Sequence, residues 1–257
     1  MRYLVDVEKV ETVVVESLTA DIVVKAGDEL VLCVETVPIL KIEGKELFVS
    51  TKFSCEVSKF SKPQEELSSI ELICPENVQR IQIFTISGNI TVSGVKVKEL
   101  FVGRVFGKTT LHGCDVKNLG IRAVSGVVEM KEVHSGNGVV EVVSGNIFCE
   151  EIRGKRWEIT TTAGDVKLVF CEIPDMRLRF DTITGKFSSN VPYFLEAGEM
   201  VFGLGSDHFS VRTSSGDLKI EIIRSKDKLI EKILRMFLEG KISKETAERL
   251  LCGMRGD

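Results

Sequence analysis

The segments IQIFTISGNITVSG (residues 81–94), IRAVSGVVEM (121–130), VEVVSGNIFC (140–149) and ITTTAGDVKL (159–168) share one pattern, a β-rich run interrupted by a glycine that usually follows a small residue. Together with Gly107, the glycines Gly88, Gly126, Gly145 and Gly164 form a series of five whose members are 19 residues apart. A unit of 19 residues is too short for a pair of helices, and β-branched residues dominate it. The repeat therefore predicts stacked β-strands.

Aligning the repeats on the glycine brings apolar residues into common columns. The column five places before the glycine contains Ile83, Val102, Ile121, Val140 and Ile159, all apolar and β-branched. We expect four further columns to face the core, because apolar residues alternate within each segment as they do in a strand with one buried face. These columns are Ile86, Val105, Val124, Val143 and Thr162; Ile90, Thr109, Val128, Ile147 and Val166; Val92, Leu111, Met130, Cys149 and Leu168; and Val95, Cys114, Val133, Ile152 and Cys171.

The predicted fold class is all-β, a single-stranded β-solenoid of the β-helix or β-roll type with coils of about 19 residues. Neighbouring coils would pair as strands about 4.8 Å apart. A sharp corner between short strands often needs a positive φ, which glycine adopts without strain. The predicted structural turn glycines are Gly88, Gly107, Gly126, Gly145, Gly164, Gly185 and Gly216.

The solenoid is predicted to occupy residues 1–225. Irregular early coils would cover residues 1–80, with strands at 12–15, 22–25, 29–35, 47–51 and 70–74 and a surface loop at 53–69. Regular coils follow over 81–190. The spacing then lengthens, to 21 residues between Gly164 and Gly185 and to 31 between Gly185 and Gly216. This predicts an insertion near 192–207 and a last coil that ends at 225.

Residues 226–257 predict a short helical hairpin. The first helix places an apolar stripe at helical spacing, made of Leu229, Ile230, Ile233, Leu234, Phe237 and Leu238. Gly240 would end it, Ser243 would cap the second helix, and the second stripe contains Ala247, Leu250, Leu251 and Met254. Two such helices cannot bury both stripes alone. They would pack on the last coil, on each other across a dimer, or on a partner, with Phe237, Leu238, Leu250 and Leu251 as candidate interaction residues.

The run LICPENVQRIQIFTISGNITVSG and the later segments AVSGVVEM, VVSGNIFC, TTAGDVKL, TITGKF and TSSGDLKI resemble the DUF4097 group of adhesin-like β-strand-repeat proteins. The shared features are a strand that ends in proline, followed by T-x-S-G-[DN]-[IV] units. The tail LRMFLEGKISKETAERLL resembles the SHOCT-like helical segment that follows such repeats in some members. The resemblance implies a β-solenoid with no established enzymatic activity, whose relatives have proposed roles in adhesion, envelope stress or assembly.

Charge and cysteine content limit the classes of function. The net charge of −4 does not favour nucleic acid or an acidic membrane surface as a partner. The sequence begins without a basic region followed by an apolar one, and no uninterrupted apolar run approaches 18 residues. Seven cysteines without a C-x-x-C pair predict buried thiols in a reducing compartment. We therefore expect a soluble, cytoplasmic protein without a membrane span.

The sequence predicts no catalytic, cofactor-binding or metal site. His112, His134 and His208 are too far apart in sequence for a ligand motif, and nucleophile elbows and phosphate loops are missing. Asn146 and Asp165 would occupy equivalent corners of adjacent coils, and Asp217 a similar corner further along. Asp165 could in principle pair with Glu141 or Glu158 as in a glycosidase. Asp and Asn at a turn, including Asn146, already have a structural explanation.

The leading functional prediction is a non-enzymatic scaffold or protein-interaction module, whose C-terminal helices dock or oligomerise. One alternative is a β-helix protein that binds or cleaves polysaccharide, for which aromatic residues are few at 7% of the chain. A second alternative is a regulator that binds DNA through the helical hairpin. That hairpin carries eight basic and six acidic residues, a nearly balanced charge that argues against DNA binding.

Overall fold

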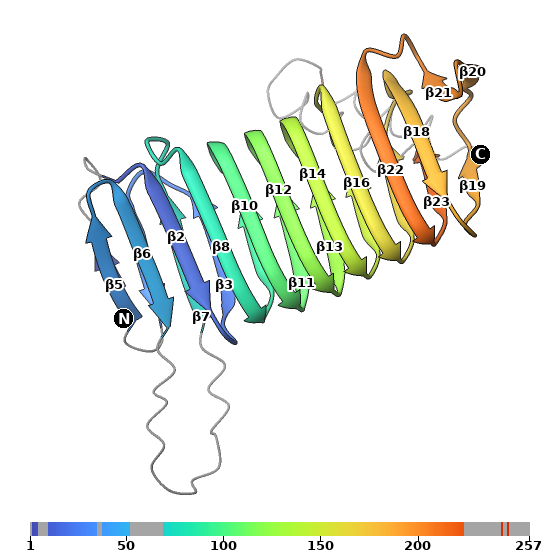
Figure 1. Cartoon of the computed structure of the whole chain (residues 1–257). Coiled ribbons are helices and arrows are strands. Elements are labelled where there is room, and N and C mark those ends of the chain that lie inside the picture. The colour runs from blue at the N-terminus through green and yellow to red at the C-terminus, as the bar shows by residue number, and fades with distance from the viewer. Residues whose placement is uncertain are drawn as a thin grey trace, which may run out of the picture.

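The computed structural model describes residues 2–4, 10–34, 38–51 and 69–223, together with Ser243 and Thr246. Within these residues the chain forms two large sheets that lie face to face (Figure 1). Sheet A contains 11 strands, in the order β1 (Arg2–Leu4), β4 (Val31–Val34), β7 (Ser69–Cys74), β3 (Asp21–Ala26), β9 (Ile90–Ser93), β11 (Lys108–His112), β13 (Val127–Lys131), β15 (Ile147–Glu150), β17 (Val166–Phe170), β23 (Leu218–Ile222) and β19 (Phe187–Ser189).

Sheet B forms the front layer in Figure 1 and contains 12 of the described strands. Their order is β20 (Phe194–Glu196), β21 (Glu199–Phe202), β18 (Met176–Thr182), β22 (Asp207–Ser215), β16 (Arg156–Ala163), β14 (His134–Ser144), β12 (Asp115–Ser125), β10 (Lys96–Phe106), β8 (Arg80–Ser87), β2 (Thr12–Ser17), β6 (Glu46–Thr51) and β5 (Pro38–Glu43). Each repeat is therefore a flattened coil with two straight sides.

The strand pairing confirms that residues 19 apart lie on top of one another. Ile121 in β12 pairs in parallel with Val140 in β14, and Val128 in β13 pairs in parallel with Ile147 in β15. Each regular coil runs along sheet B, turns at its glycine and returns along sheet A. The all-β solenoid predicted from the repeat is the observed architecture.

The core lies between the two sheets and is filled by the repeated columns. The five residues placed five positions before the glycines are all fully buried, at 0% exposure. The columns two and four places after the glycine are buried as well, including Thr109. In the column seven places after it, Cys171 is half-buried and the other four members are buried. Four of the five predicted core columns are thus confirmed.

The fifth predicted core column, two places before the glycine, is wrong. Ile86, Val124 and Val143 are exposed, Val105 is half-buried and Thr162 is exposed. Neighbouring side chains of a strand point to opposite faces, so positions five and two places before the glycine cannot both face inward. The inward position is three places before it. That column is buried and contains Thr85, Arg104, Ala123, Val142 and Thr161.

The corner glycines are required by both backbone conformation and close stacking. Gly88, Gly107, Gly126, Gly145 and Gly164 have φ between 118° and 153°. A Cβ atom at Gly107 would collide with the carbonyl oxygen of Gly88 on the coil below. Gly185 and Gly216 also lie at stacked corners, but their φ angles are outside the left-handed region. At those two positions the close approach of the backbone alone requires glycine.

The order of the coils departs from chain order at both ends. The first coil, β2 and β3, pairs with β8 and β9, and the later strands β6 and β7 lie outside it. At the other end β22 and β23 pair with β16 and β17, while the earlier β18 and β19 lie outside them. The coil that ends the described chain is therefore not the last coil of the stack.

Antiparallel strands finish both ends of sheet B and the N-terminal end of sheet A, whereas the parallel strand β19 ends sheet A at the C-terminal side. At the N-terminal end β4 pairs with β7, β1 with β4, and β5 with β6. The segment predicted as an insertion near 192–207 contains β20 and β21, and β21 pairs antiparallel with β18. Such strands cover edges that the parallel coils would otherwise leave open. The sequence predicted neither β1 nor β5.

Two sequence predictions fall outside the described residues. The loop at 53–69 belongs almost entirely to the undescribed stretch, and the helical hairpin at 226–257 is described only at Ser243 and Thr246. Its candidate interaction residues Phe237, Leu238, Leu250 and Leu251 are therefore not placed. Among the described residues, no helix has the length and apolar character needed to cross a membrane.

Candidate interaction face on sheet B

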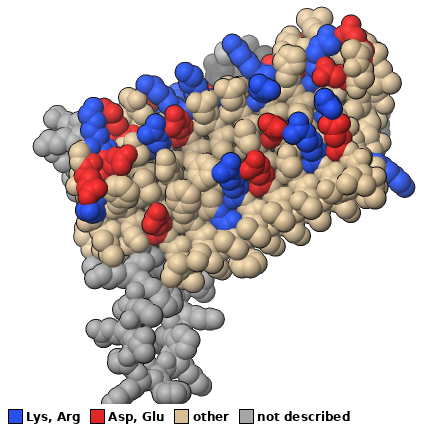
Figure 2. Space-filling view, in the orientation of Figure 1, with Lys and Arg blue, Asp and Glu red and all other residues tan. Residues whose placement is uncertain are grey.

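The column that points outward two places before each corner forms a continuous row of side chains on sheet B. We call this row the outer ladder, and it consists of Leu18, Ile86, Val105, Val124, Val143 and Thr162. The exposed fractions of Ile86, Val124 and Val143 are 48%, 46% and 53%. Figure 2 shows the lower edge of this face as a strip of largely uncharged residues. With strands about 4.8 Å apart, the six rungs extend over about 24 Å.

Two phenylalanines lie beside the outer ladder because neighbouring strands carry glycine. Phe84 and Phe101 have ring centroids 5.4 Å apart. A Cβ atom at Gly103 would lie 2.9 Å from Cδ1 of Phe84, and one at Gly120 would lie 2.9 Å from Cδ2 of Phe101. A larger side chain at either glycine would displace a ring. The glycines therefore let the rings cover the sheet surface.

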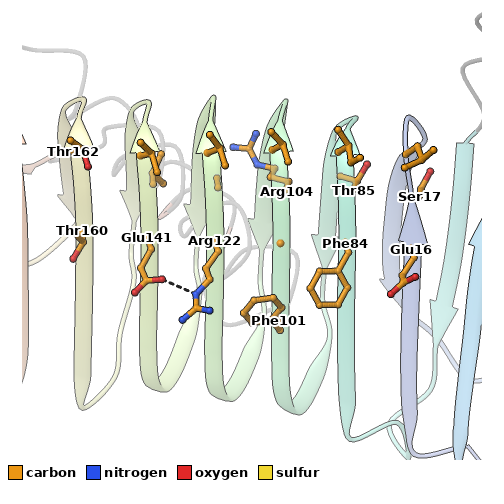
Figure 3. A pocket seen from close by; sticks show the side chains of 18 of the residues that line it. Glu16, Ser17, Phe84, Thr85, Phe101, Arg104, Arg122, Glu141, Thr160 and Thr162 are labelled. Carbon is orange, nitrogen blue, oxygen red and sulfur yellow. Dashed lines mark hydrogen bonds and ion pairs between the residues drawn. The ribbon is translucent and has the colours of Figure 1, made fainter.

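An ion pair continues this row toward the C-terminal coils. Nε of Arg122 donates a hydrogen bond to Oε2 of Glu141 at 2.7 Å, as the dashed line in Figure 3 shows. The guanidinium of Arg122 also lies 5.9 Å from the ring centroid of Phe101. Both charged side chains remain substantially exposed. The pair thus places two charged groups beside an apolar surface. Exposed ion pairs of this kind contribute little to the free energy of unfolding.

The outer ladder, the phenylalanines and the ion pair line one open groove of about 840 Å³. Its lining extends from Ser50 on β6, past Glu16 and Leu18 on the first coil, to Thr160 and Thr162 on β16. Most of the ladder is aliphatic, and only its last rung is hydroxylic. An apolar groove with a few polar groups at fixed positions is typical of a binding surface.

Arg104 lies beneath the groove at an inward position. It is 4% exposed, and its Nη2 donates a hydrogen bond to the carbonyl oxygen of Val127 at 2.7 Å. Its Nη1 donates to the carbonyl oxygens of Gly107 and Ser125. Burial lowers the pKa of Arg104 to about 10, so the side chain is still charged at neutral pH. Arg104 therefore joins two successive corners under the outer ladder.

Beyond Thr162 the same face becomes polar. Nη1 of Arg212 lies 3.1 Å from Oε1 of Glu158, and Nε of Arg179 lies 3.0 Å from Oδ2 of Asp181. A smaller hollow of about 260 Å³ lies here, between Thr160 and Ser214. On these later strands ion pairs thus lie on the outer face, beyond the aliphatic rungs of the outer ladder.

The carboxylates considered for glycosidase chemistry have partners within the solenoid. Oδ1 of Asp165 accepts a hydrogen bond from the backbone N–H of Asp217 at 2.8 Å, and Oδ1 of Asn146 accepts one from Asp165 at 2.9 Å. These corner residues thus cap the next coil. Glu141 and Glu158 lie instead on the outer face of sheet B, in ion pairs with Arg122 and Arg212. The turn explanation therefore holds for Asn146 and Asp165, and each of the two glutamates has an arginine partner.

The histidines and cysteines are dispersed. His112, His134 and His208 are exposed on different strands. No group of three metal-binding side chains occurs among the described residues. Cys74, Cys114 and Cys149 are buried free thiols, and burial raises the pKa of each of them, in Cys74 to about 12. Buried thiols of this kind pack as small apolar side chains.

Stacked parallel coils, glycine corners and an apolar outer face define a β-solenoid repeat protein. The chain belongs to the Toastrack DUF4097 family, whose model matches residues 52–221. This supports the resemblance to DUF4097 that the S-G repeats indicate, whereas the SHOCT-like resemblance of the tail is not supported. No curated protein matches the chain in sequence.

Several solved structures resemble this chain at low sequence identity. A candidate adhesin from Bacteroides fragilis is 13% identical with a TM-score of 0.54, over 87% of this chain and 96% of that chain. A candidate adhesin from Parabacteroides merdae is 9% identical with a TM-score of 0.44, over 87% and 95%. A candidate lipid-binding protein from Parabacteroides distasonis is 14% identical with a TM-score of 0.45, over 85% and 96%. At such identities the likeness concerns the fold alone.

Proposed function

We propose that this chain is a non-enzymatic protein-interaction module that binds a protein partner on the groove of sheet B. The observation that carries the proposal is the outer ladder, because five aliphatic side chains in register, followed by Thr162, present an apolar row along one face. Exposed contiguous apolar surface on a soluble protein commonly marks an interaction site. The described cysteines suit a reducing compartment, so the proposal places the module in the cytoplasm.

An amphipathic helix of the partner fits the groove best. The rungs of the outer ladder repeat about every 4.8 Å, close to the distance of about 5–6 Å between helix residues three or four apart. A helix of about 16 residues covers about 24 Å, which is the length of the ladder. The exposed pair Arg122–Glu141 borders the apolar row and gives a bound helix a polar contact that fixes its position.

The experiment compares substitutions at two positions on either side of one corner, whose side chains point outward from opposite sheets. Val124→Lys places a charge in the outer ladder, whereas Val127→Lys places the same charge on sheet A, where Val127 is 36% exposed. Full-length protein carrying a photo-crosslinking residue at position 124 or 127 is expressed in the native host. We expect a discrete crosslinked protein from position 124 only. Capture of the same protein by a crosslinking residue at position 143, the next rung of the outer ladder, should fall at least about tenfold when Val124→Lys is added and stay unchanged when Val127→Lys is added.

Equal crosslinking from both positions, or capture that survives Val124→Lys, would contradict the proposal. Thermal unfolding of both variants provides the control, because exposed substitutions should leave stability within about 0.5 kcal/mol of the parent protein. A crosslinked product that proves to be a second copy of this chain would identify self-association and exclude a separate partner.

Glycan binding is a second candidate, favoured by the neighbouring rings of Phe84, which is exposed, and Phe101, which is half-buried. Aromatic rings on a flat sheet can stack against sugar rings, and Arg122 and Glu141 lie beside them with hydrogen-bonding groups (Figure 3). We expect any binding on a glycan array to disappear in Phe101→Ala and to persist in Phe148→Ala, which changes sheet A instead. Absence of all array signal from the parent protein would remove this candidate.

A further inference from the structure

A second row of outward side chains on sheet B runs beside the outer ladder and carries the exposed charges of the groove. We call it the charged row, and its members pair from strand to strand in the order Glu16, Phe84, Gly103, Arg122, Glu141 and Thr160. Each member precedes a rung of the outer ladder by two residues on the same strand, so both rows face the same side of the sheet. All six members line the groove. A partner that covers the outer ladder therefore covers the charged row as well.

Among the described residues, Glu16 is the charged member of this row that has no opposite charge on a neighbouring strand. Glu16 is exposed, and its neighbours in the pairing are Ser50 on β6 and Phe84 on β8. Arg122 and Glu141, in contrast, form an ion pair with each other. A partner that fills the groove removes water from the carboxylate of Glu16, and burying an unpaired charge is costly. The groove therefore favours a partner that brings a positive charge to Glu16.

Phe84 offers this positive charge a second contact. Its ring is 37% exposed, and it belongs to the strand directly beside that of Glu16, with the two backbones about 4.8 Å apart. Figure 3 shows the two side chains next to each other on the same side of the sheet. A guanidinium stacks on an aromatic face and pairs with a carboxylate through two parallel hydrogen bonds, whereas an ammonium group is a compact point charge. These two groups together therefore suit arginine better than lysine.

The same face of sheet B already holds one arginine between a phenylalanine and a glutamate. The guanidinium of Arg122 lies 5.9 Å from the ring centroid of Phe101, and its Nε donates a hydrogen bond to Oε2 of Glu141 at 2.7 Å. That arginine comes from β12, which lies between β10 with the ring and β14 with the carboxylate. The strands β2 and β8, which carry Glu16 and Phe84, are direct neighbours. An arginine that contacts both groups there must therefore approach from outside the sheet.

We propose that Glu16 and Phe84 form a binding site for an arginine side chain of the partner protein. The inference rests on the proposed function, because the arginine belongs to the protein that fills the groove. The site lies beside Leu18 and Ile86, the first two rungs of the outer ladder. An arginine near one end of the apolar stripe of the bound helix thus fixes both the register and the direction of that helix along the groove.

The first test is a nuclear magnetic resonance titration of isotope-labelled full-length protein with N-acetyl-arginine methylamide and, separately, with the corresponding lysine compound. We expect the backbone amide signals of Glu16 and Phe84 to shift, with half-saturation at a concentration at least about fivefold lower for the arginine compound. Glu16→Gln removes the charge and should raise that concentration at least about fivefold. The matched control is Glu76→Gln, which changes an exposed glutamate in the turn between β7 and β8 and should leave the concentration unchanged.

The titration has outcomes that would overturn the inference. These are no shift at Glu16 and Phe84 in the parent protein, equal half-saturation by the two compounds, and binding that survives Glu16→Gln. A second variant, Phe84→Leu, keeps an apolar side chain without the aromatic face and should remove the preference for arginine over lysine. A preference that persists in Phe84→Leu would contradict the role of the ring.

The second test uses the partner captured by the crosslinking residue at position 143. Glu16→Lys should lower this capture at least about tenfold, because it places two positive charges against each other, whereas Glu76→Lys should leave it unchanged. Capture that is lost in Val124→Lys but survives Glu16→Lys would overturn this inference and leave the proposed function intact. Capture that survives Val124→Lys would contradict the proposed function, and the titration would still decide whether Glu16 and Phe84 bind arginine.

Discussion

Arg104 occupies a position at which the neighbouring coils carry a residue no larger than valine. The next coil has Ala123 there, and this small side chain leaves room for the guanidinium to reach the corner above. Removing one charged donor usually leaves buried carbonyl groups unsatisfied. The free-energy cost of burying the guanidinium without an acidic partner offsets part of the stabilisation that its hydrogen bonds to these carbonyl groups provide.

We predict that Arg104→Met lowers the free energy of unfolding by about 2 kcal/mol, because the carbonyl groups of Gly107, Ser125 and Val127 lose their shared donor. The measurement is urea denaturation followed by circular dichroism. Arg122→Met, one coil further on and exposed, is the matched control and should change stability by less than about 1 kcal/mol. Equal effects of the two substitutions would refute a special role for Arg104.

Thiol reactivity provides a second prediction for individual side chains. The thiolate is the reactive form, and burial raises the pKa of Cys74, Cys114 and Cys149, so less thiolate is present at any given pH. In the folded protein at pH 8.5 we expect iodoacetamide to modify half-buried Cys33 much faster than these three cysteines. Peptide mass mapping measures the difference, which should vanish in urea. Comparable labelling in the folded state would contradict the burial of the core columns.

At the scale of strands and corners, the repeat predicted part of the fold correctly and part of it wrongly. The glycine period and the column that begins with Ile83 were sufficient to predict coils and their register. The column with Ile86 and Val124 was misassigned because its residues are as apolar as those of the core. A strict count of two residues per strand period would have put it outside, together with Phe84 and Phe101, and would have indicated the groove.

Alanine substitutions at two glycines can separate the energetic cost of a positive φ from the cost of a clash with the neighbouring coil. Gly107 and Gly113 both have positive φ, at 123° and 61°, but only Gly107 faces the backbone of the coil below, whereas a Cβ atom at Gly113 would meet nothing within 4 Å. We predict that Gly113→Ala destabilises the protein by about 1 kcal/mol and Gly107→Ala by more than about 3 kcal/mol. Thermal unfolding measures both. Similar losses at the two positions would show that stacking adds nothing.

The complete stack could not be derived from the sequence, because every coil presents almost the same columns to its neighbours. Ala20 lies at the corner below Gly88, and Gly216 lies next to Gly164, although neither follows its neighbour at the repeat interval. Local patterns cannot choose between such pairings, since each would bury equivalent residues. Long-range contacts decide the order. The placement of β1, β5 and β20 at the edges follows from the same global choice.

Stability should be distributed unevenly along this stack. Coils in the middle have neighbours on both sides, and each edge strand has one. We predict that backbone amides of β12 and β14 exchange with deuterium more slowly than those of β5 by at least about 100-fold. Exchange measured peptide by peptide provides the comparison. Uniform protection from end to end would mean that the solenoid opens as one cooperative unit.

The inverted order of coils at both ends has a consequence for how such a protein can change its length during evolution. A copy of the unit inserted before β2 or after β23 would meet strands that already lie at the ends of the stack. Tandem duplication is compatible with the fold only in the interior, where each new copy lengthens the body by about 4.8 Å and adds one rung to the outer row. The number of repeats between the two ends therefore sets the length of the outer ladder and of the proposed binding face.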